Sequence, residues 1–205
     1  NTTYTATITT GAKDLAGNGL ASPYVWSWTT GATPDTTAPM VSSILFASGA
    51  TGVAVNTKFA PTFSEPMDPL TITSTTFTVT GPGGTPVAGS IVYTGVTAVF
   101  TPASNLAPNT TYTATITTGA KDLAGNALAS PYVWSWTTGA TPDTNAPVVS
   151  SSFIGATGGA TNLKVTATFS EAMDPWTIST VTFTLNQGAT PVSGSVIYSG
   201  VTATF

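Results

Sequence analysis

The sequence lacks most of the side chains that enzymes use for chemistry. Among its 205 residues there is no cysteine, no histidine and no arginine, and only 6% of the residues are charged. The absence of cysteine excludes disulfide bonds and thiolate metal sites, so stability must come from packing or from bound ions. The absence of histidine removes the commonest general base and metal ligand. We therefore expect a protein without catalytic activity.

The charges that remain give no positive surface. Four lysines stand against eight acidic residues, for a formal net charge of −4. No basic patch can neutralise phosphates or anionic lipid, so we expect neither nucleic acid nor a membrane as a partner. No apolar run approaches the roughly 20 residues of a membrane span, and the first residues lack the pattern of a signal peptide. Threonine and serine replace charged residues, which is typical of a secreted or cell-surface protein.

What the sequence has instead is an internal repeat. The segment NTTYTATITTGAKDLAGN begins at residue 1 and returns at residue 109, and both copies continue into nearly the same LASPYVWSWTTGATPDT. Self-similarity at a fixed period is the signature of a repeat array. The repeat predicts the last two strands of one copy over residues 1–34, a complete copy over 35–142, and the first five strands of a further copy over 143–205.

Within the complete copy, apolar and polar residues alternate between clusters of glycine, proline, asparagine and serine, which predicts strands. About seven strands are expected, over residues 40–47, 57–64, 76–80, 89–94, 97–101, 111–118 and 132–138. Short strands without helices predict an all-β fold of tandem Ig-like Greek-key β-sandwiches. The alternation places these residues on the inner faces: Phe59, Phe63, Tyr112, Ala114, Ile116, Tyr132, Trp134 and Trp136.

Three local motifs agree with a sandwich. The segment LAPNTTY has the spacing of a tyrosine corner, in which Tyr112 hydrogen-bonds to the backbone just upstream. Asp68 followed by Pro69 has the pattern of a helix cap, so we expect a single helical turn there. In DLAGN, Asp122 is expected to accept a hydrogen bond from the backbone two residues further on.

Four segments of the complete copy share a pattern with a known family: ATGVAVNTKFAPTFSEPMD, TFTVTGPGGTPVAG, LAPNTTYTATITTGAKDLAGNALA and WSWTTG. Together they resemble the bacterial Ig-like domain found in surface-layer-associated proteins and giant adhesins, and the resemblance covers essentially the whole chain. It implies an extracellular spacer or adhesive module, usually in long arrays and sometimes appended to secreted enzymes. It implies no catalytic residue.

The acidic residues occupy a restricted set of places. In an Ig-like sandwich, the start of the first strand and the second-to-third and sixth-to-seventh connections lie at one end. The acids of the complete copy fall in these segments, at Asp35, Glu65, Asp68 and Asp122. The further copy has Asp143, Glu171 and Asp174, and a segment such as the one that bears Asp14 would complete it. Oxygen ligands from several loops suit Ca²⁺, so we predict calcium at the domain junctions; the alternative is that each acid caps a turn or faces water.

One other row of side chains suggests a ligand. Thr113, Thr115 and Thr117 alternate along the sixth predicted strand and share one of its faces. Such a row could present hydroxyl groups to ice or to a surface glycan, although threonine is also a good strand former on a solvated face. A binding function therefore stays open beside a structural one.

The sequence favours an extracellular structural repeat that forms a stalk, filament or surface layer. Near-identical copies suit a spacer, and the partner is then a copy of itself. Residues 143–205 lack the last two strands and residues 1–34 are those two strands, so we expect head-to-tail completion, either between chains or along one longer continuous chain. Two alternatives are an adhesive module for glycan, ice or a host surface, and an accessory domain of a secreted hydrolase.

Overall fold

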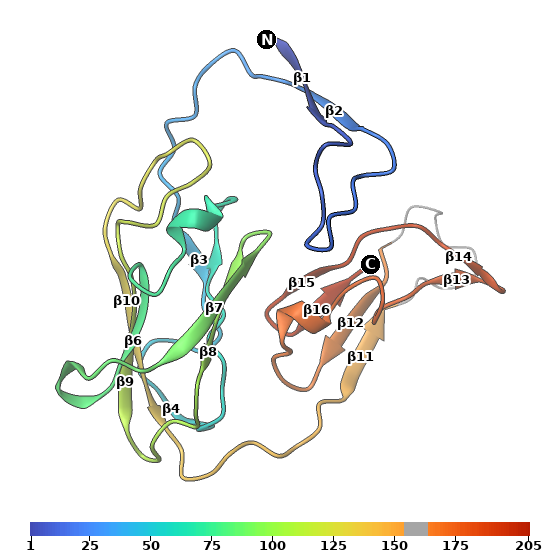
Figure 1. Cartoon of the computed structure of the whole chain (residues 1–205). Coiled ribbons are helices and arrows are strands. Elements are labelled where there is room, and N and C mark those ends of the chain that lie inside the picture. Colours follow the sequence, from blue (N-terminus) through green and yellow to red (C-terminus); the bar gives the residue numbers. More distant parts are fainter. Residues whose placement is uncertain (154–163) are drawn as a thin grey trace. The chain divides into compact units, whose positions relative to one another are not determined.

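The computed structural model describes residues 1–153 and 164–205, which form an all-β chain (Figure 1). The chain divides into two compact units, Asn1–Thr37 and Ala38–Phe205. Residues 154–163 of the predicted further copy lie outside the described residues. In the described part, no helix has the length and apolar character needed to span a membrane.

The complete copy is a sandwich of two four-stranded sheets (Figure 1). The first sheet, in the order β3-β5-β8-β7, contains β3 (Val41–Ser43), β5 (Thr62–Phe63), β7 (Gly89–Thr94) and β8 (Thr97–Pro102). The second, in the order β4-β10-β9-β6, contains β4 (Ala50–Val53), β6 (Phe77–Thr80), β9 (Thr111–Ile116) and β10 (Tyr132–Thr138). Two packed sheets with these connections are an Ig-like architecture, so the predicted fold class is confirmed.

The first two predicted strands differ from the structure in their extent. The expected strand over 40–47 shrinks to β3, which pairs with β5, and the prediction missed β4, which follows that range and pairs parallel to β10 in the other sheet. Gly49, with a φ of 86°, supplies the left-handed backbone immediately before β4. The expected strand over 57–64 shrinks to β5, since Pro61 has no N–H for the ladder and only an isolated bridge joins Phe59 to Phe100.

The core lies between the two sheets and includes the predicted inward-facing side chains, of which Tyr132 is half-buried and packs against the others. Phe59, Phe63, Trp134 and Trp136 are all buried, with at most 3% of their surface exposed. The ring centroids of Phe59 and Trp136 are 4.2 Å apart, and Tyr112 stacks on Trp136 at 6.0 Å. Because these rings come from both sheets, the alternation in the sequence located the core correctly.

The predicted local motifs are also present. The backbone N–H of Ala107 donates to the Tyr112 hydroxyl at 2.9 Å, which is the bond of a tyrosine corner. The single turn η1 (Pro69–Thr71) is a 3-10 helix, and the Oδ1 atom of Asp68 caps it by accepting from the N–H of Leu70 at 3.0 Å. A further short turn, η2 (Pro82–Gly84), follows β6 and was not predicted.

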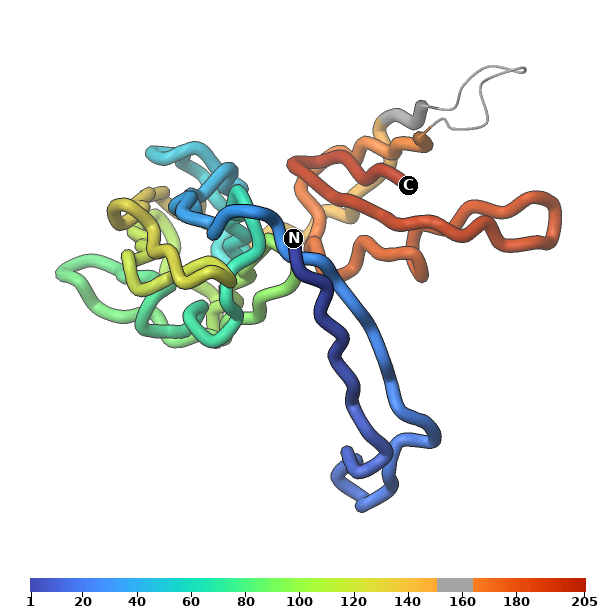
Figure 2. Tube along the Cα trace, turned by 90° about the horizontal axis from the view of Figure 1, so that it is seen from above, coloured from blue at the N-terminus to red at the C-terminus, as the bar shows by residue number. Residues whose placement is uncertain are grey.

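The unit Asn1–Thr37 repeats one hairpin of the complete copy. Its strands β1 (Thr3–Ile8) and β2 (Tyr24–Thr29) run alongside each other in Figure 2. Tyr4 lies opposite Trp28, as Tyr112 lies opposite Trp136 in the complete copy. The same sequence therefore forms the same hairpin register with and without the rest of a sandwich around it.

Residues 143–205 repeat the first sheet of the sandwich. The order β11-β12-β16-β15 corresponds to β3-β5-β8-β7, with β11 (Val149–Phe153), β12 (Thr166–Phe169), β15 (Ile197–Ser199), β16 (Thr202–Thr204) and the turn η3 (Pro175–Thr177). The remaining strands, β13 (Asn186–Gln187) and β14 (Thr190–Pro191), form only a short hairpin. In the complete copy β6 pairs with β9. Residues 143–205 contain no counterpart of β9, which explains why no long strand forms around Phe183.

Candidate functional sites

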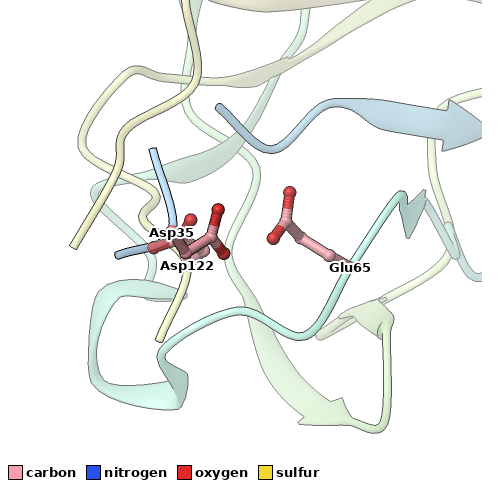
Figure 3. Close-up of side chains that lie close together, drawn as sticks. All are labelled: Asp35, Glu65 and Asp122. Carbon is pink, nitrogen blue, oxygen red and sulfur yellow. The ribbon is translucent and has the colours of Figure 1, made fainter. Parts of the chain in front are cut away.

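Three of the predicted metal ligands lie close together, as Figure 3 shows. Asp35, Glu65 and Asp122 each offer a carboxylate oxygen, and these oxygens all lie within 4.8 Å of one another. Asp122 is buried, Glu65 is half-buried and Asp35 is exposed. Three such oxygens are part of the set of about six to eight that Ca²⁺ takes. The predicted ligand Asp68 is not in this group, and its Oδ1 atom caps η1.

Asp122 also organises its own loop. Its Oδ1 atom accepts from the N–H groups of Ala124 and Asn126, and its Oδ2 atom accepts from the Asn126 side chain, all at 2.8 Å. Burial acts to raise the pKa of Asp122, but the hydrogen bonds from Asn126 and Ala124 outweigh it and lower that pKa. The predicted bond to the residue two positions on is thus confirmed.

Asp14 makes the same contacts in the first unit. Its Oδ1 atom accepts from the N–H groups of Ala16 and Asn18, at 2.9 and 2.8 Å, and its Oδ2 atom accepts from the Asn18 side chain at 3.0 Å. The hydrogen bonds from Asn18 are the main cause of a lowered pKa for Asp14. Because the loop forms with the same hydrogen bonds in both units, its own five residues specify its shape.

The further copy contains a pair of facing acids. The Asp143 and Glu171 carboxyl groups hydrogen-bond to each other, and this contact, followed by burial and the charge of Asp143, raises the pKa of Glu171. The N–H of Asn145, at 2.9 Å from Asp143 Oδ1, is the first cause of a lowered pKa for Asp143, and the Glu171 contact is the second. Two ionised carboxylates at this spacing repel each other, so a proton or a cation between them is favourable.

Asp174, the last predicted ligand, has a different partner. Its Oδ1 atom caps η3 by accepting from the N–H of Trp176 at 3.1 Å, and its Oδ2 atom binds the ammonium group of Lys58 in the complete copy. The amide of Asn56 hydrogen-bonds to the backbone of Asp143 nearby. Sequence reasoning missed Asn56 and Lys58; the available signal was their joint return as Asn162 and Lys164.

The second candidate site is the uncovered inner face of the first unit. Tyr4, Trp26 and Trp28 are 50%, 42% and 47% exposed, whereas their counterparts in the complete copy are at most 7% exposed. Those counterparts are Tyr112, Trp134 and Trp136. The residue types and the hairpin register are the same, so the difference comes from the sheet that covers this face in the complete copy.

The further copy has the complementary open face. Phe169, Phe183 and Phe205 are only half-buried, although their counterparts Phe63, Phe77 and Phe100 are buried. Phe183 and Phe205 still pack against each other, with ring centroids 5.9 Å apart. Exposed aromatic faces of this kind are typical of surfaces that bind another protein segment.

The threonine row is present as predicted. Thr113, Thr115 and Thr117 are half-buried and alternate with the buried side chains of β9. Thr115 lies opposite Thr78 on β6 and Val133 on β10. The row therefore lies on the outer face of the second sheet, between two neighbouring strands.

Comparison with known families gives one match, which covers most of the chain. A family model described as "Bacterial Ig-like domain" matches residues 1–30, 35–138 and 143–205. A search of curated proteins found no match. Among solved structures, domains 1–6 of the surface layer protein SbsC are 24% identical, with a TM-score of 0.42, over 56% of this chain and 15% of that chain. The N-terminal part of the bacterial S-layer protein SbsC is 19% identical over 81% of this chain and 37% of that chain, with a TM-score of 0.40.

An enzyme also appears among these structural likenesses. The LD transpeptidase LdtMt1 in complex with imipenem is 17% identical over 50% of this chain and 41% of that chain, with a TM-score of 0.37. Overlaps at this level carry no argument about activity. The chain spans only a small part of the surface layer proteins it matches, so what those whole proteins do does not transfer with the fold.

Proposed function

The chain belongs to the bacterial Ig-like domain family, and from that premise we propose that it is a non-catalytic, extracellular structural repeat of a stalk, filament or surface layer. Its copies are close to identical over the shared segments, which suits a spacer that needs one unit many times. Its low charge and lack of cysteine suit a chain that relies on packed sandwiches for stability.

The observation that supports this proposal most is the pair of open inner faces. The face of β1 and β2 exposes Trp26 and Trp28, and the sheet of residues 143–205 leaves Phe183 and Phe205 partly uncovered. We propose that the two faces complete each other head to tail. Covering each aromatic side chain contributes about 1.5–3 kcal/mol. A contact between unlike surfaces propagates into a filament unless its rotation closes a ring.

Sedimentation of the full chain over a range of concentrations tests completion. We expect association that strengthens with concentration and weakens in a Trp26→Ser/Trp28→Ser variant. Val25→Ser is the matched control, because Val25 lies on the same strand and its counterpart Val133 is exposed even in the complete sandwich. A parent chain that remains monomeric throughout would refute completion between chains, and equal weakening by the control would refute the role of the inner face.

We also propose that Asp35, Glu65 and Asp122 contribute to a Ca²⁺ site in each complete copy, with Asp143 and Glu171 as the corresponding pair in the further copy. The support is the short spacing of the carboxylate oxygens, whose mutual repulsion a cation would relieve. The expected Kd is about 10⁻⁴ to 10⁻³ M, the range of extracellular modules.

Titration calorimetry and melting curves test the calcium site in the full chain. Ca²⁺ should raise the Tm of the parent, and Glu65→Gln should reduce that rise. Asp68→Asn is the control, because Asp68 lies outside the group and asparagine retains the capping oxygen. No heat of binding and an unchanged Tm in the parent would eliminate the site.

A further inference from the structure

Two contacts join the complete copy to the copy that follows it. The Asn56 side chain donates to the carbonyl oxygen of Asp143 and accepts from its N–H, both at 3.0 Å. Two residues further on, Lys58 pairs with the Oδ2 atom of Asp174. All four residues line one groove, with a volume of about 930 Å³, between the two copies. We refer to this set, Asn56 and Lys58 with Asp143 and Asp174, as the junction clasp.

Two side chains of the clasp, Asn56 and Asp174, each make two polar contacts. One carboxamide satisfies both backbone polar groups of Asp143, as a neighbouring strand would. The Asp174 carboxylate divides its oxygens, since Oδ1 caps η3 and Oδ2 accepts the Lys58 ammonium. The cap orients the Asp174 carboxylate so that its second oxygen faces Lys58. The Asp174 side chain is 23% exposed, so its charge-assisted hydrogen bond with Lys58 is partly shielded from water.

The complete copy also carries the acceptor half of a second clasp. Asp68 occupies the place of Asp174: its Oδ1 atom caps η1 in the same way. Its Oδ2 atom has no partner among residues 1–153 and 164–205. The donor half recurs in the further copy, where exposed Lys164 stands at the position of Lys58.

From this arrangement we infer that the lysine–aspartate contact of the clasp recurs at every junction, and that Lys164 of one chain binds the free oxygen of Asp68 in the next. The inference rests on the proposed head-to-tail completion. Residues 143–205 of one chain, completed by residues 1–34 of the next, form a copy that is followed directly by residues 35–142 of that second chain. Lys164 then faces Asp68 as Lys58 faces Asp174. The clasp gives the array a direction, with lysine at one end of each copy and aspartate at the other.

The clasp within one chain can be tested by distance measurement. The chain contains no cysteine, so cysteines introduced at Val92 and Ile197, exposed residues at equivalent positions of two copies, take spin labels specifically. Labelled chain is diluted into unlabelled chain, so that only the two labels within one chain lie close enough to be measured. Double electron–electron resonance should then give a narrow distribution of the distance between them. Lys58→Gln and Asp174→Asn should each broaden this distance distribution, and the double variant should broaden it no more than either single variant does. The control Lys121→Gln should leave the distribution narrow.

The clasp between chains is tested by self-association. Lys164→Gln and Asp68→Asn should each lower the association constant by up to about fivefold. The double variant should lower it no further than either single variant, and the control Lys121→Gln should leave it unchanged. Unchanged association in both variants overturns the contact between chains. A parent chain that never associates refutes the proposed completion instead, and the spin-label measurement then still decides the clasp: a broad parent distribution, or one that Lys58→Gln leaves unchanged, overturns it.

Discussion

Trp26 and Trp134 occupy the same position in two copies of one sequence, but they differ in burial. Trp134 is 3% exposed and packs against Phe77 and Tyr132, with ring centroids 6.0 and 5.7 Å away. Trp26 is 42% exposed and contacts Tyr24 at 5.6 Å, which is the same local neighbour. What Trp26 lacks is the opposite side of the sandwich. The two residues therefore separate the effect of the local sequence from the effect of packing.

Replacing each tryptophan by alanine should give very different results. Trp134→Ala removes a buried ring and leaves a cavity, which should cost about 3–5 kcal/mol of unfolding free energy. With a urea m-value of about 1–3 kcal/mol/M, the midpoint of the main transition should fall by at least about 1 M. Trp26→Ala leaves no such cavity in the monomer, so this midpoint should change little.

The assay is urea unfolding followed by far-UV circular dichroism, at a concentration where the chain is monomeric. Under these conditions the main transition reports on the complete copy, provided that it is a single cooperative step. Equal midpoint shifts for the two variants, or a larger shift for Trp26→Ala, would refute the assignment of a covered and an uncovered inner face.

Three further changes test other parts of the structure. Tyr112→Phe should cost about 1 kcal/mol in the same assay, through loss of the bond from Ala107 with little change in packing. Asp122→Ala should cost about 1.5–3 kcal/mol, because the N–H groups of Ala124 and Asn126 lose a charged, buried acceptor, whereas Asp14→Ala in the exposed loop should leave the transition nearly unchanged. Lowering the pH from 7 toward the ordinary pKa of a glutamate should slightly raise the Tm of residues 143–205, because Glu171, with its raised pKa, takes up a proton first in the folded chain, and Glu171→Gln should abolish that rise.

The acids show how one residue type has several functions in this fold. Asp122 and Asp14 shape loops, Asp68 and Asp174 cap short helical turns, and Glu171 pairs with an aspartate. A calcium ion between Asp143 and Glu171 would replace the hydrogen bond of that pair, whereas the hydrogen bonds of the loops and caps would remain. The junction clasp, by contrast, uses an ammonium group on Asp174, so it should hold the two copies together even when calcium is removed.

The sequence alone determined the features that depend on neighbours along the chain. Alternation identified the inner faces, the spacing LAPNTTY located the tyrosine corner, and Asp68-Pro69 predicted a capped turn. The loop of DLAGN closes on itself in both units, because the carboxylate of Asp122 or Asp14 accepts from residues two and four positions further on. Such features need few partners from elsewhere, and so the local sequence is sufficient to specify them.

Only the tertiary structure decided where the chain changes sheets and which side chains are covered. Strand β4, which the sequence did not predict, depends on its partner β10, which lies far along the sequence. The tryptophans of identical YVWSW segments are exposed in one unit and buried in the other, since their burial requires an opposite sheet. Lys58 meets Asp174 for the same reason: the contact joins residues from two copies, and no pattern within one copy contains it.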